Sequence, residues 1–146
     1  MPNYNAPIIE EFRTNGGKVG GFFEGATLLL LHSTGAKTGR EHVNPCDYLP
    51  DGDRFIVFAT KSGAPTNPDW YYNLLANPQA TVEVGTETIR VRAHEIRDED
   101  ERRELYARQV ERRPGFAEYP KKTSRRIPIL ALERAPRGTA DSASPP

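Results

Sequence analysis

The sequence has little of several features that mark particular classes of protein. Its single cysteine, Cys46, excludes an intrachain disulfide and a cysteine-based zinc site. Basic and acidic side chains number 20 each, and this zero net charge argues against a surface built for nucleic acid. The longest strongly apolar run is Leu28 to Leu31, far too short for a membrane span, so no stable membrane insertion is expected.

Other absences bear on location and on metal binding. The N-terminus has no apolar signal core, and one cysteine fits a reducing compartment, so we expect a cytoplasmic protein. The histidines His32, His42 and His94 are dispersed and lack the spacing of metal ligands, so no metal site is predicted.

The length of 146 residues is enough for one domain with its own core. We place this domain at residues 1–134. The segment 135–146 is rich in proline, glycine, serine and alanine and has no apolar pattern, so a disordered tail is predicted there.

Short apolar or alternating segments separated by turn residues predict about six strands. They cover residues 27–33, 42–49, 54–59, 81–84, 88–94 and 127–132. Helices are predicted over 7–13 and 69–76, and a further helix begins near residue 98. The strand connections are short and turn-like, and no strand–helix–strand unit repeats, which disfavours a Rossmann sheet. The pattern predicts an α+β protein: a closed or half-closed β-barrel of mostly antiparallel strands with flanking short helices.

A tight turn follows the first apolar run. Gly35 and Gly39 bracket Lys37 and Thr38, so the backbone can fold tightly and leave amides exposed to an anion. A polar β-hairpin turn explains the same residues, and both interpretations stay open. A nucleotide-binding P-loop is excluded, because Ala36 replaces the required glycine and a strand follows instead of a helix.

A second block, residues 59–73, places small residues, Lys61 and a glycine directly after a predicted core strand, and Trp70 and Tyr71 follow. A planar cofactor needs a flat apolar wall, whereas a phosphorylated tail needs cations and amides. The two blocks together offer both. Taken alone, Trp70 is better explained as a residue that closes the barrel end with Leu74.

The combined motifs resemble the deazaflavin-dependent nitroreductase family of actinobacteria over residues 20–133. The matching segments are Thr34-Gly35-x-Lys37-Thr38-Gly39, Asn44-Pro45, Thr60-Lys61-Ser62-Gly63-Ala64, Asn67-Pro68-x-Trp70-Tyr71-x-Asn73 and Ile127-Pro128-Ile129. The resemblance implies a split β-barrel that binds reduced coenzyme F420. It also implies hydride transfer from the deazaflavin to quinone-like, activated-alkene or nitro-aromatic acceptors.

The resemblance further implies site residues. Those expected to contact the cofactor are Ala36, Lys37, Thr38, His42, Val43, Asn44, Pro45, Cys46, Phe58, Ala59, Thr60, Lys61, Asp69, Trp70, Tyr71, Tyr72 and Asn73. Those expected to contact the acceptor are Asp47, Phe116 and Tyr119. Tyr119 or Thr60 would deliver or relay the proton that follows hydride transfer, and Tyr119 would orient the acceptor. F420 is a polyanion, which suits Lys37, Lys61 and Arg40.

Several positions depart from the family pattern. Ala36 and His42 stand where arginine is frequent, and Asp47 stands where an aromatic residue can line the pocket. Arg113 and Phe116 replace tyrosines of the prodrug-activating relatives.

Two alternatives stay open: a non-catalytic split barrel that binds a lipid or other hydrophobic ligand, and a relative that binds FMN. The expected partner of the enzyme is a small-molecule electron acceptor. Split barrels commonly form homodimers, although no residue pattern here fixes the oligomeric state.

Overall fold

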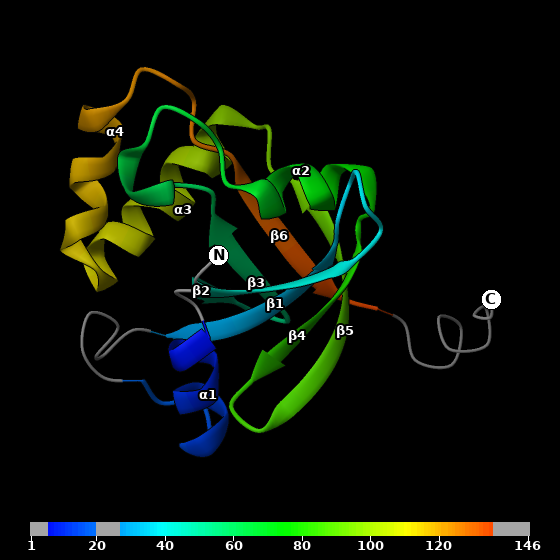
Figure 1. The fold of residues 1–146 in the computed structure, drawn as a ribbon. Coiled ribbons are helices and arrows are strands. Elements are labelled where there is room, and N and C mark those ends of the chain that lie inside the picture. Colours follow the sequence, from blue (N-terminus) through cyan, green and yellow to red (C-terminus); the bar gives the residue numbers. More distant parts are fainter. Residues whose placement is uncertain (1–5, 20–26, 136–146) are drawn as a thin grey trace.

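Six antiparallel strands close into a barrel in the order β1-β2-β3-β6-β5-β4 (Figure 1). The strands are β1 (Leu28–Thr34), β2 (Glu41–Asp51), β3 (Arg54–Phe58), β4 (Gln79–Val84), β5 (Glu87–Glu95) and β6 (Ile129–Arg134). The computed structural model describes residues 6–19 and 27–135. The prediction of a six-stranded, mostly antiparallel barrel is confirmed.

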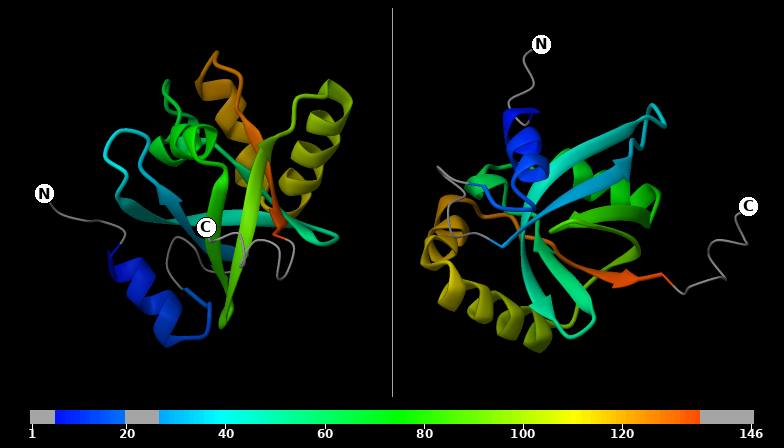
Figure 2. Two further views of the ribbon diagram at one scale, coloured as in Figure 1. Left: turned by 90° about the vertical axis from the view of Figure 1, so that its right-hand side faces the viewer. Right: turned by 90° about the horizontal axis from the view of Figure 1, so that it is seen from below.

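Short helices surround the barrel (Figure 2). They are α1 (Ala6–Thr14), α2 (Asp69–Ala76), α3 (Glu99–Arg112) and α4 (Tyr119–Lys122), with 3₁₀ turns η2 (Lys61–Gly63) and η3 (Pro114–Glu118). The start of α3 shows why sequence signals located it well. The Asp98 carboxylate accepts the Glu101 amide hydrogen at 2.9 Å, and acidic residues fill the first turn. No helix among the described residues is long and apolar enough to cross a membrane.

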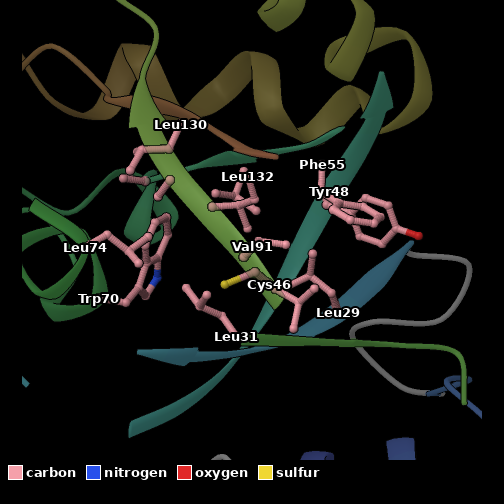
Figure 3. Packing of buried hydrophobic residues seen from close by; sticks show 14 of the residues in the cluster. Leu29, Leu31, Cys46, Tyr48, Phe55, Trp70, Leu74, Val91, Leu130 and Leu132 are labelled. Carbon is pink, nitrogen blue, oxygen red and sulfur yellow. The ribbon is translucent and has the colours of Figure 1, made fainter. Parts of the chain in front are cut away.

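Strand β1 is apolar over Leu28–Leu31 because both faces of this part are covered. Leu29 and Leu31 point into the barrel, whereas Leu28 and Leu30 pack outside against Phe12 of α1. Strand β5 has one wet face, so its apolar residues alternate with exposed arginines. Figure 3 shows the barrel interior, with Trp70 and Leu74 of α2 on one side of the cluster. Trp70 is 8 % exposed, as expected for a residue at the barrel end.

Strand boundaries differ from the predictions by one or two residues, and those near the C-terminus have a physical cause. The last strand begins at Ile129, two residues later than expected, and continues to Arg134. Pro128 has no amide hydrogen to donate to a ladder, and its carbonyl accepts the Ala59 amide at 2.9 Å instead. Ala135 belongs with the sheet, because its amide donates to the Arg90 carbonyl at 2.9 Å. The rest of the predicted tail, 136–146, lies outside the described residues, and the domain limit at residue 134 stays a prediction.

Candidate cofactor and acceptor site

A cavity of about 190 Å³ lies beside β2 and the end of β3. Its lining comes from four separate stretches of chain: Pro45, Cys46, Asp47, Phe58, Thr60, Lys61, Trp70, Arg113, Phe116 and Tyr119. The cavity is therefore lined by six of the residues predicted to contact the cofactor and by all three predicted to contact the acceptor. A larger hollow of about 370 Å³, lined by residues of β1, β4 and β5 among others, contains none of the predicted site residues.

The loop after β3 carries an unusual backbone conformation at this cavity. Lys61 has φ of +46°, and no other non-glycine residue in the described ranges has a positive φ. Such a conformation is strained for a residue with a side chain, and strain of this kind concentrates at functional sites. Gly63 follows with φ of +81°, and a β-carbon there would lie 2.8 Å from the Lys122 β-carbon. Only glycine at position 63 lets this loop approach α4 so closely. This close approach keeps Lys61 near Tyr119.

Arg125 anchors the same loop through its guanidinium group. Nε donates to the Ala64 carbonyl at 2.8 Å, and Nη2 donates to the Thr60 carbonyl at 2.6 Å. Nη1 donates to the Ala59 carbonyl at 3.1 Å and to Asn67 Oδ1 at 2.6 Å. Arg125 thereby positions the residues that precede and follow Lys61. Sequence reasoning missed it, because nothing local distinguishes it from the neighbouring Arg126.

The turn between β1 and β2 is an ordered hairpin connection. The Gly35 amide donates to the Arg40 carbonyl at 2.7 Å, and the Gly39 amide donates to the Gly35 carbonyl at 3.0 Å. A β-carbon on Gly35 would lie 2.9 Å from His42 Nε2, so the imidazole packs closely across the hairpin. The side chains of Lys37 and Arg40 are exposed. Several amides are thus used internally, and the exposed cations are the groups left to meet an anion.

Asn73 fastens this turn to α2. Its Oδ1 accepts the Ala36 amide hydrogen at 2.9 Å, and its Nδ2 donates to Ser33 Oγ at 3.3 Å. Asn73 is 7 % exposed and Ser33 is 1 % exposed. The structure therefore gives the Asn73 side chain a positioning role. It does not place that side chain in the cavity.

Other predicted cofactor residues also lie away from the cavity lining. Ala59 is fully buried in the barrel core, and Val43 packs toward the cluster under α1. Tyr71 donates its hydroxyl to Glu95 Oε1 at 2.9 Å. The full set outside the lining is Ala36, Lys37, Thr38, His42, Val43, Asn44, Ala59, Asp69, Tyr71, Tyr72 and Asn73. Their cofactor contacts stay predictions.

Burial sets the charge state of the groups at the cavity. It raises the pKa of the Cys46 thiol to about 12, with a smaller contribution from Asp47, so this sulfur is neutral and no nucleophile. Burial also raises the pKa of Asp47, although the Arg113 guanidinium opposes that shift. Arg113 Nε lies 2.9 Å from Asp47 Oδ2. Sequence reasoning noted Arg113 as a replaced tyrosine but did not assign it to the site.

Aromatic rings form the rest of the wall. The Phe116 ring lies 5.1 Å from Tyr119 and 5.9 Å from Phe58 between centroids, both edge to face. An apolar wall with cations nearby suits a planar, anionic redox cofactor. No group of three or more histidine, cysteine or acidic side chains among the described residues could hold a metal.

The barrel and this cavity define an oxidoreductase of the split-barrel class. Residues 8–134 match the F420H(2)-dependent quinone reductase family, and the chain belongs to that family. It is therefore an oxidoreductase that uses reduced coenzyme F420. This membership confirms the family resemblance, and it favours the enzyme over the alternatives of a non-catalytic binder and an FMN-binding relative.

Similar proteins agree with this assignment. An F420H(2)-dependent quinone reductase of Mycobacterium tuberculosis strain H37Rv is 36 % identical over 126 residues, which cover 84 % of this chain and 85 % of that protein. The solved structure of an F420-H2 dependent reductase, FDR-A, is 34 % identical with a TM-score of 0.67, covering 73 % of this chain and 94 % of the other. A structure described as a domain-swapped dimer is 32 % identical with a TM-score of 0.68, covering 87 % and 92 %.

Proposed function

We propose that this chain binds F420H2 with the deazaflavin ring in the cavity beside β2 and its anionic tail toward the Gly35–Arg40 turn, and that it reduces a quinone held at Asp47, Phe116 and Tyr119. One observation supports this most strongly. Six of the predicted cofactor residues and all three predicted acceptor residues, which are distant in sequence, line the same cavity. The exposed Lys37 and Arg40, together with Lys61, supply cations for a polyanionic tail.

The protein's own contribution is positioning and exclusion of water. When bound, the reduced deazaflavin supplies the hydride. Trp70 and Phe58 are each at most 8 % exposed, so they give the cavity a fixed apolar wall that would position the ring and limit its contact with water. We infer that Thr60, whose carbonyl Arg125 holds, or the half-buried Tyr119 passes a proton to the acceptor.

Titration of the purified protein with F420, followed by fluorescence, tests the proposal. Saturable binding is expected. Lys37→Ala and Lys61→Ala should each weaken it by roughly tenfold, because each removes a charge-assisted contact to the cofactor. Lys18→Ala, an exposed lysine beyond α1, is the matched control and should leave affinity unchanged. Saturable binding of FMN in place of F420, or F420 binding indifferent to both lysines, would contradict the proposed site.

Acceptors other than quinones belong to the proposal as well. We infer that activated alkenes and nitro-aromatic compounds enter the same cavity, since each needs only an electrophilic centre near the cofactor ring. Parallel turnover assays with a naphthoquinone and a nitroimidazole separate these acceptor classes.

The cytoplasmic location stays a prediction.

We also infer a homodimer. Tyr72 and Leu75 on α2 are 48 % and 50 % exposed, the large apolar side chains most open to solvent among the described residues. The similar structure described as a domain-swapped dimer supports this inference. Light scattering on the protein as it elutes from a size-exclusion column measures its mass directly. A monomeric mass at micromolar concentration would contradict it.

A further inference from the structure

Arg113 and Asp47 form an ion pair at the acceptor side of the cavity. Both residues line it. The Asp47 side chain is 9 % exposed, and its two carboxylate oxygens are buried without a well-directed hydrogen bond. The Arg113 side chain is 26 % exposed, so the guanidinium, not the carboxylate, is the member of the pair accessible from the cavity.

The backbone of Arg113 is held in place. Arg113 caps the C-terminus of α3, and its amide donates to the Gln109 carbonyl at 2.7 Å. Nε faces Asp47, and neither Nη group donates a hydrogen bond within standard geometry to the described residues. Two oriented donors, pre-positioned by a buried carboxylate, are what a site for a negatively charged oxygen requires.

Quinone reduction creates such an oxygen. The hydride from the reduced cofactor brings one hydrogen and an electron pair, which leaves the hydroquinone monoanion with one hydroxyl group and one negatively charged oxygen. A proton then completes the hydroquinone. A cation that contacts the developing oxyanion lowers the barrier to hydride transfer, because it interacts more strongly with the transition state than with the neutral quinone.

We propose that Arg113 is a catalytic residue whose Nη groups bind the quinone oxygen that becomes negative, and that Asp47 is its positioning residue. This rests on the proposed placement of the acceptor in the cavity. Lys61, the other cation of the cavity lining, lies on the loop assigned to the cofactor, and its Nζ donates to Thr66 Oγ1 at 3.1 Å. The subsite therefore favours quinones that carry or develop an oxyanion.

The first test measures binding in the absence of cofactor. Trp70 is the only tryptophan and lines the cavity, so its fluorescence reports occupancy. The probes are 2-hydroxy-1,4-naphthoquinone, an anion at neutral pH, and its uncharged 2-methoxy analogue. The native protein should bind the anion more tightly than it binds the uncharged methoxy compound. Arg113→Gln should weaken binding of the anion by roughly tenfold or more and change binding of the methoxy compound by less than about twofold.

Matched variants keep the result interpretable. Arg103→Gln removes the same charge from an exposed position on α3 and should leave the anion preference intact. If Arg113→Gln fails to fold because it leaves Asp47 unpaired, the double variant Asp47→Asn/Arg113→Gln removes both charges and should show the same loss of preference. An anion preference absent from the native protein, or kept by both Arg113 variants, would overturn the proposal.

Steady-state kinetics separate binding from positioning. Asp47→Asn keeps the Arg113 charge but frees its side chain, so it should lower kcat for the uncharged quinone while anion binding is retained or strengthened. Unchanged kcat would remove the positioning role. F420 titration of the same proteins shows whether a negative result contradicts the role of Arg113 or the proposed function as a whole. Normal F420 binding without an anion preference overturns this inference alone, whereas absent F420 binding overturns the proposed function.

Discussion

Arg125→Ala should lower both the stability of the protein and its affinity for F420. The substitution removes hydrogen bonds to four oxygens of the 59–67 loop. We expect a loss of about 3 kcal/mol in the free energy of unfolding, or roughly 10 °C in melting temperature. Because the strained loop at Lys61 then samples other conformations, the binding-competent fraction falls, and F420 affinity should drop at least tenfold. Thermal melts and F420 titration measure the two effects.

Arg126→Ala is the control for this experiment. Arg126 is the next residue, and its side chain is 53 % exposed where it pairs with Glu99, so its loss should cost less than about 1 kcal/mol. Arg125→Lys keeps the charge, but lysine cannot donate to all four oxygens at once. It should therefore lower the free energy of unfolding and the F420 affinity nearly as much as Arg125→Ala does. Equal melting temperatures for Arg125→Ala and Arg126→Ala would show that the loop does not depend on this anchor.

Asn73→Leu should detach the β1–β2 turn from α2. The variant leaves the buried Ser33 hydroxyl and the Ala36 amide without their partners, at a cost of about 2 kcal/mol. Hydrogen exchange at the Ala36 amide should become fast while the core amides stay protected. F420 affinity should fall severalfold, because Lys37 and Arg40 lose their fixed position.

Asn77→Leu changes an exposed asparagine at the end of the same helix and should affect neither quantity. The two substitutions add the same side chain, so a difference between them isolates the buried amide. If Ala36 exchanges at the native rate in Asn73→Leu, the turn is held by other contacts, and the role given to Asn73 is wrong.

The strands were predictable where the pattern of apolar residues in the sequence matches the burial of those residues in the barrel. The continuous apolar run of β1 and the alternation of β5 each correspond to the burial observed. The start of β6 was misplaced, because the pairing of Pro128 depends on Ala59, which is remote in sequence. Hydrophobic periodicity alone does not show where a ladder begins.

The site was less predictable than the fold. The resemblance named residues of the cavity lining, such as Trp70 and Phe116, but their meeting is a property of the closed barrel. Arg125 and Arg113 were not assigned because their partners lie on other elements. Asn73 was expected to face a ligand, yet its amide turns inward to the hairpin. The positive φ of Lys61 has no signature in the residue type.

The place of β6 in the sheet has a consequence for biosynthesis. β6 is the last strand of the residues that the structure describes, yet it lies between β3 and β5. The barrel therefore cannot close until β6 has been made, because β3 and β5 have no other strand to join them. Arg125, just ahead of β6, is also made long after the 59–67 loop that it holds, so that loop has no such anchor until then.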